Sequence, residues 1–225
     1  FLTKISIPSH IDSIGDFSFS KCTSLEEIKI PDSVKRIGKN CFSYCVNLKK
    51  IQISNSVEII ENGVFSNCHN LEELIIPKSV RSLGDLCFYK CENLKKLKFS
   101  EDVKYIKHIG KYCFYGCQAL KEISISDAMS EIEDYCFAEC SSLTKFFVPD
   151  SIVNIKKCAF KNCESLTYLR FSDNCLLKEI GDFAFDNCNS LRNFSFPNSV
   201  EIIGESAFSS CHQLSKLVLP QALKL

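Results

Sequence analysis

A short marker, Phe-x-x-Cys-x-x-Leu, recurs from one end of the chain to the other. Its Cys falls at positions 22, 45, 68, 91, 117, 140, 163, 188 and 211, so successive copies are 23, 25 or 26 residues apart. Self-similarity at such a period is typical of a solenoid, in which each copy buries its apolar face only by stacking on its neighbours. The marker therefore predicts a single elongated domain over residues 1–225.

Each copy contains one short segment in which apolar and polar residues alternate, as in Ile51-Gln52-Ile53. This alternation predicts a β-strand with one buried face. Ten such strands are expected, at residues 5–7, 28–30, 51–53, 74–76, 97–99, 123–125, 146–148, 169–171, 194–196 and 217–219. All six prolines directly follow one of these segments, where a residue without an N–H ends the strand.

The remainder of each copy is expected to return the chain to the next strand. In one copy Val34 and Ile37 point inward, Gly38 turns the chain, and Cys41, Phe42 and Cys45 have the spacing of a short helical turn. Nine phenylalanines in the equivalent position form a column: Phe19, Phe42, Phe65, Phe88, Phe114, Phe137, Phe160, Phe185 and Phe208. The fold class is thus predicted to be an α/β repeat, a leucine-rich-repeat solenoid of about nine 23-residue copies. Its parallel β-ladder would form the concave face and the helical turns the convex face.

Two copies are longer than the others, by three residues within 101–110 and by two within 172–181. Both insertions follow a strand, so we expect them to bulge outward without breaking the ladder. Residues 2–8 align with residues 25–31, and the chain stops soon after Pro220, within a copy. We therefore expect an excerpt of a longer array that lacks both caps.

The fifteen cysteines allow three interpretations: buried structural thiols, disulfides or a metal site. Nine belong to the marker, and Cys41, Cys87, Cys113 and Cys136 precede a column Phe where other copies have Ala. A small side chain is what that position requires, which favours buried thiols. A ladder also spreads thiols evenly, whereas zinc needs four converging ligands, so no metal site is predicted.

Other composition narrows the possible functions. Lys plus Arg equals Asp plus Glu at 27 each, which disfavours nucleic acid as the main partner. The sequence contains no run of 18 apolar residues, so no membrane-spanning segment is predicted, and the first residues do not resemble a signal peptide. His10, His69, His108 and His212 lie in distant copies, and no Gly-rich phosphate loop occurs. We therefore predict no catalytic residues and no cofactor.

Side chains that point outward from the ladder are free of packing constraints. In one outward column the charge alternates in sign over Lys4, Glu27, Lys50, Glu73, Lys96, Glu122 and Lys145. This predicts cross-strand ion pairs and a neutral, solvated face.

The alternation ends where Lys145, Phe147, Tyr168 and Arg170 occupy outward positions of adjacent strands. We predict that these four form a protein-binding patch on the concave face, because aromatic residues and Arg are enriched at interfaces, with an ordinary surface as the alternative. Asn193-Phe194-Ser195 matches the N-glycosylation acceptor pattern, and a glycan on Asn193 would obstruct the patch.

The repeated unit resembles the BspA-like leucine-rich repeats, with the pattern I-P-x-S-V-x-x-I-G-x-x-A-F-x-x-C-x-x-L, over essentially the whole chain. That family occurs in surface proteins of some anaerobic bacteria and of parasitic protists such as trichomonads. The resemblance implies a non-catalytic role at the cell surface or secreted: adhesion, recognition of a host or matrix protein, or another protein contact, including one with a self protein. The many thiols leave a cytoplasmic scaffold for a protein partner as the alternative.

Overall fold

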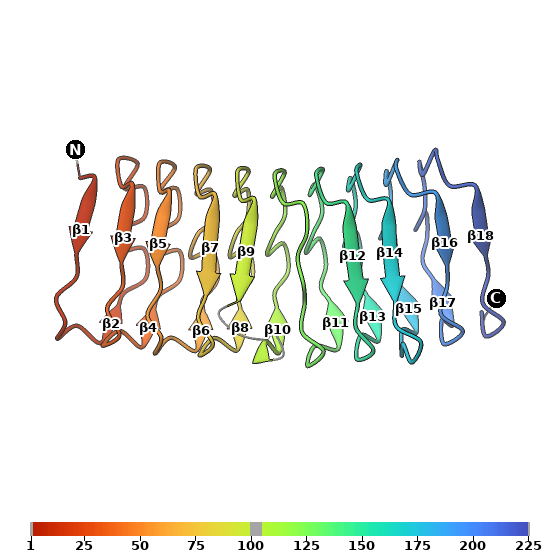
Figure 1. The fold of residues 1–225 in the computed structure, drawn as a ribbon, viewed down its shortest axis with the longest axis horizontal. Coiled ribbons are helices and arrows are strands. Elements are labelled where there is room, and N and C mark those ends of the chain that lie inside the picture. The colour runs from red at the N-terminus through yellow and green to blue at the C-terminus, as the bar shows by residue number, and fades with distance from the viewer. Residues whose placement is uncertain (1, 100–104, 225) are drawn as a thin grey trace.

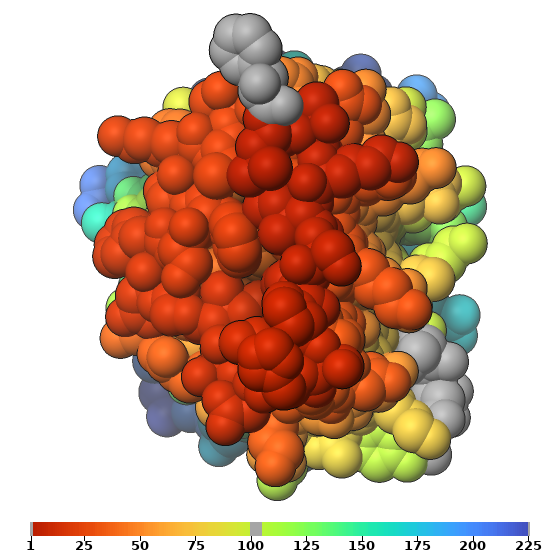
Figure 2. Space-filling view, turned by 90° about the vertical axis from the view of Figure 1, so that its left-hand side faces the viewer, coloured from red at the N-terminus to blue at the C-terminus, as the bar shows by residue number. Residues whose placement is uncertain are grey.

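The computed structural model describes residues 2–99 and 105–224. The chain forms a row of stacked coils, with its two termini at opposite ends of the long axis (Figure 1). Viewed from the N-terminal end, the first coil lies over the coils behind it (Figure 2). This arrangement confirms the predicted solenoid, in which each coil contacts the coil before it and the coil after it.

The first ladder consists of the longer strands, and it runs along one side of the rod (Figure 1). Its strands are β1 (Lys4–Ser6), β3 (Glu27–Lys29), β5 (Lys50–Gln52), β7 (Glu73–Ile76), β9 (Lys96–Phe99), β12 (Lys145–Val148), β14 (Tyr168–Phe171), β16 (Asn193–Ser195) and β18 (Lys216–Val218). All the pairs it contains are parallel and in register, such as Ile28 opposite Ile51. Nine of the ten predicted strands are therefore present.

The strand predicted at residues 123–125 does not form. Ile123 and Ile125 remain buried, but residues 121–126 pair with neither β9 nor β12. This coil follows the three-residue insertion, part of which, residues 101–104, lies outside the described residues. The expectation that the insertions leave the ladder intact is wrong, since β14 and β16, which flank the second insertion, are also unpaired. β5 and β7 are unpaired as well, although no extra residues lie between them, so the interruptions do not depend on extra residues alone.

A second ladder forms from the segment that the sequence predicted only as a turn. Its strands are two residues long: β2 (Ser13–Ile14), β4 (Arg36–Ile37), β6 (Ile59–Ile60), β8 (Ser82–Leu83), β10 (His108–Ile109), β11 (Glu131–Ile132), β13 (Asn154–Ile155), β15 (Glu179–Ile180) and β17 (Ile202–Ile203). They make one five-stranded and one four-stranded parallel sheet. In eight of the nine strands the second residue is a buried Ile or Leu that faces the core.

The predicted short helical turns are wrong, because the described residues contain no helix. Along the third side of each coil, backbone amides alternate between two kinds of acceptor. The Cys41 amide donates to the Gly38 carbonyl in its own coil at 3.3 Å, whereas the Phe42 amide donates to the Val64 carbonyl of the next coil at 3.0 Å. Asn40 and Tyr44 adopt left-handed φ values of 52° and 58°, which a right-handed helix does not tolerate. Hydrogen bonds between coils thus replace those of a helix.

The column of phenylalanines fills the centre of the solenoid, as predicted. Neighbouring rings are stacked with centroids 5.2–6.0 Å apart. The seven inner members, from Phe42 to Phe185, are completely buried, and Phe19 and Phe208 at the two ends are partly exposed. Burial of about 150–250 Å² per ring makes this column a large apolar contribution to the fold.

The glycines of the turn allow adjacent coils to approach closely. A Cβ at Gly84 would lie 2.6 Å from the backbone nitrogen of Asn62 in the preceding coil. The φ angle of Gly84 is not in the left-handed region, so close packing and not backbone conformation requires glycine here.

Candidate functional site

Opposite charges neutralise the N-terminal half of the outer face of the first ladder. Lys4 pairs with Glu27, and Lys96 pairs with Glu73 at 3.3 Å. In the adjacent column Lys49 pairs with Glu26 and Lys95 with Glu72, at 3.1 and 2.9 Å. The predicted ion pairs are therefore confirmed for Lys4 with Glu27 and for Glu73 with Lys96. Exposed pairs of this kind contribute little to stability.

The charge alternation does not produce ion pairs beyond Lys96. Within residues 2–99 and 105–224, no ion pair involves Glu122 or Lys145. Within the same residues Lys50 has no ion pair either, although it lies opposite Glu27 in the register of β3 and β5, so regular alternation does not by itself produce contacts. The second half of this face is thus electrostatically different from the first.

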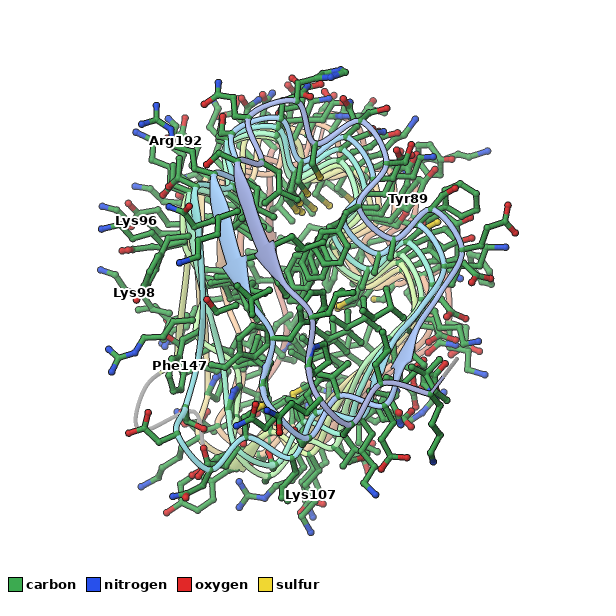
Figure 3. The ribbon with its side chains drawn as sticks, turned by 90° about the vertical axis from the view of Figure 1, so that its right-hand side faces the viewer. Tyr89, Lys96, Lys98, Lys107, Phe147 and Arg192 are labelled. Atoms are coloured by element: carbon green, nitrogen blue, oxygen red, sulfur yellow. The ribbon has the colours of Figure 1, made fainter. Side chains whose placement is uncertain are left out.

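Strands β12 and β14 bring the four predicted patch residues together. Lys145 lies opposite Tyr168 in the parallel register, and Phe147 lies opposite Arg170. Phe147 and Tyr168 are 48% and 53% exposed, although both are large aromatic residues. Phe147, Lys96 and Lys98 point outward on the side of the first ladder (Figure 3). These four residues, Lys145, Phe147, Tyr168 and Arg170, are hereafter called the aromatic-cationic patch; its binding role stays a prediction.

A hollow lies on each side of this patch. The upstream hollow has a volume of about 460 Å³, with Leu97, Ile123 and Phe146 at its apolar floor, and all four patch residues line it. It coincides with the missing strand between β9 and β12. The Lys121 carbonyl of that coil still accepts a hydrogen bond from the Thr144 amide at 3.0 Å, but residues 123–125 form no strand, so the ladder is interrupted at this hollow.

The downstream hollow has a volume of about 420 Å³ and lies where β14 and β16 are unpaired. Tyr168 and Arg170 line it together with Phe196 and Asn193. The predicted glycosylation position therefore lies at the edge of the patch. A third hollow, of about 380 Å³, lies at the unpaired boundary of β5 and β7 and contains both Lys50 and Glu73.

Sequence reasoning missed a cluster of four tyrosines, Tyr89, Tyr112, Tyr115 and Tyr135. The ring centroids of Tyr89 and Tyr115 are 5.1 Å apart, and those of Tyr112 and Tyr135 are 4.6 Å apart. Tyr89 lies on the side of the rod opposite the first ladder (Figure 3). The Tyr115 hydroxyl donates to Glu139 Oε1 at 2.6 Å, and burial, followed by this hydrogen bond, raises the pKa of Tyr115.

The signal for this cluster was present in the repeat. Tyr89 and Tyr115 directly follow a column Phe, and Tyr112 and Tyr135 stand two residues before one. All four rings are only partly exposed, because they pack against one another between the turns of adjacent coils.

The marker cysteines form a hydrogen-bonded column beside the phenylalanines. In eight of the nine, the thiol donates to the carbonyl oxygen of the column Phe in the preceding coil, at 3.1–3.2 Å. All fifteen cysteines are free thiols, and thirteen are buried. Burial raises the pKa of Cys41 and of Cys45 to about 12. Their protonated state favours a structural role over nucleophilic chemistry.

The described residues contain no group of three or more His, Cys, Asp or Glu side chains arranged to hold a metal ion. Over the same residues, the structure has no helix with the length and apolar character needed to cross a membrane.

Comparison with known proteins identifies the repeat. The family model described as BspA type leucine rich repeat region matches residues 1–108 and 107–225, in six copies. Comparison with curated protein sequences gives no match.

Solved structures of bacterial repeat proteins share the fold. A leucine-rich repeat protein from Bacteroides ovatus superposes with a TM-score of 0.72 at 24% identity, over 99% of this chain and 76% of that one. The pneumococcal vaccine antigen PcpA gives 0.61 at 24% identity, over 94% of this chain and 55% of that one. A leucine-rich repeat protein of T. pallidum gives 0.55 at 21% identity, over 94% and 78%. Because the family model spans both halves of the chain, this protein belongs to the BspA-type leucine-rich repeat family.

Proposed function

We propose that this chain is a non-catalytic protein-binding module that contacts its partner through the aromatic-cationic patch on the outer face of the first ladder. One observation carries the proposal: two half-exposed aromatic rings and two cations without ion pairs among the described residues share adjacent strands, with a hollow on each side. Aromatic residues and Arg dominate the energetics of protein interfaces. Solenoids present such continuous surfaces to their partners.

The proposed setting is a cell surface, with adhesion or recognition of a host or matrix protein as the role. Support comes from the family and from the likeness to a pneumococcal protein described as a vaccine antigen, a description that fits exposure to a host. A cytoplasmic scaffold is the second candidate, favoured by the fifteen free thiols, since secreted proteins usually oxidise such cysteines.

The two settings are separated by labelling intact source cells with a reagent that does not enter them. We expect the protein to be labelled and recovered in the surface fraction. Recovery only in the cytosolic fraction, without label, would instead establish the scaffold.

The patch itself is tested by changing its aromatic residues. We expect Phe147→Ser combined with Tyr168→Ser to lower the affinity for the protein partner at least 30-fold, because loss of interface anchors typically costs about 2 kcal/mol or more of binding free energy. A partner would be captured from host and source-cell lysates, identified, purified and measured by titration against both forms.

A matched control removes equally exposed apolar side chains away from the patch. Ile59 and Ile75 are 50% and 58% exposed, so Ile59→Ser combined with Ile75→Ser should leave the affinity within about twofold. Equal affinity for the patch variant and the unaltered chain would refute the patch as the binding surface.

A further inference from the structure

The outer face of the first ladder changes charge along the rod. From Lys4 to Lys96, cations and anions are interspersed and four pairs of them are in contact. Beyond that point, six cations face outward from the ladder and its leading edge: Lys98, Lys121, Lys145, Arg170, Arg192 and Lys216. Glu122 is the single acidic residue in the same columns. The second half of the outer face of the first ladder is therefore cationic, although the net charge of the whole chain is zero.

These cations are available for a partner. Within the part of the chain that the structure describes, no ion pair involves any of the six. All six side chains are exposed. Among the residues that the structure describes, Glu122 is also the one acidic residue that lines either of the two hollows beside the patch. An acidic ligand would therefore meet little repulsion at this surface.

The hollows define how such a ligand would lie. They flank the two strands β12 and β14, and strands in a sheet are about 4.8 Å apart, so the centres of the hollows are separated by roughly 10–15 Å. Four residues of extended chain span about 13 Å. An extended segment that runs along the rod axis can thus place one side chain in each hollow, with the residues between them over Lys145, Tyr168 and Arg170.

We propose that the aromatic-cationic patch binds an extended acidic segment of a protein, with two apolar or aromatic side chains about four residues apart and carboxylates between them. The apolar side chains would enter the upstream hollow, over Ile123 and Phe146, and the downstream hollow, over Phe196. Side chains alternate between the two faces of an extended chain, so the middle one of three intervening residues points toward the patch. Its carboxylate would pair with Lys145 and Arg170, the latter through its planar guanidinium. This inference rests on the proposed function, because it names the partner chemistry of the same surface.

The test uses synthetic peptides and the whole chain. In each peptide two phenylalanines are separated by two, three or four acidic residues, and affinity is measured by calorimetric titration at 50 and 500 mM salt. We expect the member with three acidic residues to bind most tightly and to weaken at least tenfold at the higher salt. Control peptides have Gln and Asn, or Lys and Arg, in place of the acidic residues, or Ser in place of both phenylalanines. Each of these should bind at least tenfold more weakly.

Charge-neutralising variants locate the contact. Arg170→Gln and Lys145→Gln should each lower the affinity for the acidic peptide about tenfold and leave the affinity for the peptide with Gln and Asn unchanged. Lys50→Gln, in the separate hollow beside β5 and β7, is the matched control and should have no effect. The thermal midpoint of each variant verifies that it is folded.

Equal affinity for acidic and neutral peptides, or no binding by any acidic member, would overturn the inference. Neither result bears on the proposed function, which is decided by the effect of Phe147→Ser with Tyr168→Ser on a captured protein partner. If that double variant retains full partner affinity, the proposed function itself fails.

Discussion

Replacing Phe114 with Ala is expected to lower the free energy of unfolding by about 3–5 kcal/mol. The Phe114 ring is completely buried and stacks between Phe88 and Phe137, at centroid distances of 5.3 and 5.4 Å. A truncated side chain leaves a cavity that the rings on either side cannot fill, because hydrogen bonds between coils hold them at a fixed spacing.

The position of Phe114 near the middle of the rod adds a second expected effect. Stability in a solenoid is approximately the sum of each coil and its contacts with its neighbours. Weakening one central contact should therefore broaden the urea unfolding transition or divide it into two, as well as shift its midpoint. Circular dichroism and hydrogen exchange measured across the same urea series would show both.

Phe147→Ala provides the control for this experiment, because it removes the same ring from a position that is 48% exposed. Its expected effect on the free energy of unfolding is below about 1 kcal/mol. A similar loss of stability in the two variants would show that burial in the stacked column does not stabilise the fold as expected.

Raising the pH is expected to unfold the chain between about pH 10 and 11, through its buried thiols. Six marker cysteines, Cys68, Cys91, Cys117, Cys140, Cys163 and Cys188, are completely buried. Burial raises the pKa of each above the ordinary value of 9.0. The folded state then keeps its thiol protons above pH 9, whereas the unfolded state releases them.

This difference in bound protons sets the direction and the size of the effect. Stability is fully present below the unfolded pKa of 9.0 and falls as the pH rises above it, by about 1.4 kcal/mol per pH unit for each thiol. These six thiols alone give a slope on the order of 8 kcal/mol per pH unit, and Cys41, Cys87 and Cys136, whose pKa is raised as well, add about 4 kcal/mol per pH unit to it. Because typical domains have only about 5–15 kcal/mol of stability, unfolding within two pH units follows.

The measurement is the urea midpoint at intervals from pH 7 to pH 10, in the presence of reductant. The control variant carries Cys41→Ala, Cys87→Ala and Cys136→Ala, at positions where other coils have Ala159, Ala184 and Ala207. Burial raises the pKa of all three thiols, so their removal should reduce the slope by about 4 kcal/mol per pH unit. The same slope in both proteins would show that buried thiols do not govern the alkaline stability.

Tyrosine contributions can be separated from those of the thiols. Burial raises the pKa of Tyr115 above its ordinary value of 10.0, so its effect on stability begins only above pH 10. A slope that is already steep between pH 9 and pH 10 therefore belongs to the cysteines.

Part of the candidate site was predictable from the repeat alone. Counting from the marker places Lys145 beside Tyr168 and Phe147 beside Arg170, and the parallel register has those pairs. The hollows were not predictable, because they depend on where the ladder is interrupted. The alternating column predicted further ion pairs at Glu122, but Glu122 forms none within residues 2–99 and 105–224.

By itself the sequence determined the period, the column of phenylalanines and the outward columns of the first ladder. A residue that recurs every 23 residues must lie next to its counterpart in the adjacent copy when the coils stack. Phe42 therefore lies over Phe19, and Glu27 lies beside Lys4. This follows from alignment of the copies and needs no knowledge of the backbone path between them.

Only the tertiary structure decided how each coil closes and where the ladder opens. The spacing of Cys41, Phe42 and Cys45 is compatible with a helical turn, yet the Phe42 amide bonds to Val64 in the next coil instead. Likewise, the two-residue strands such as β4 exist through their pairing with adjacent coils. Hydrogen bonds between coils compete with local ones, and a single copy of the sequence contains only the local partners.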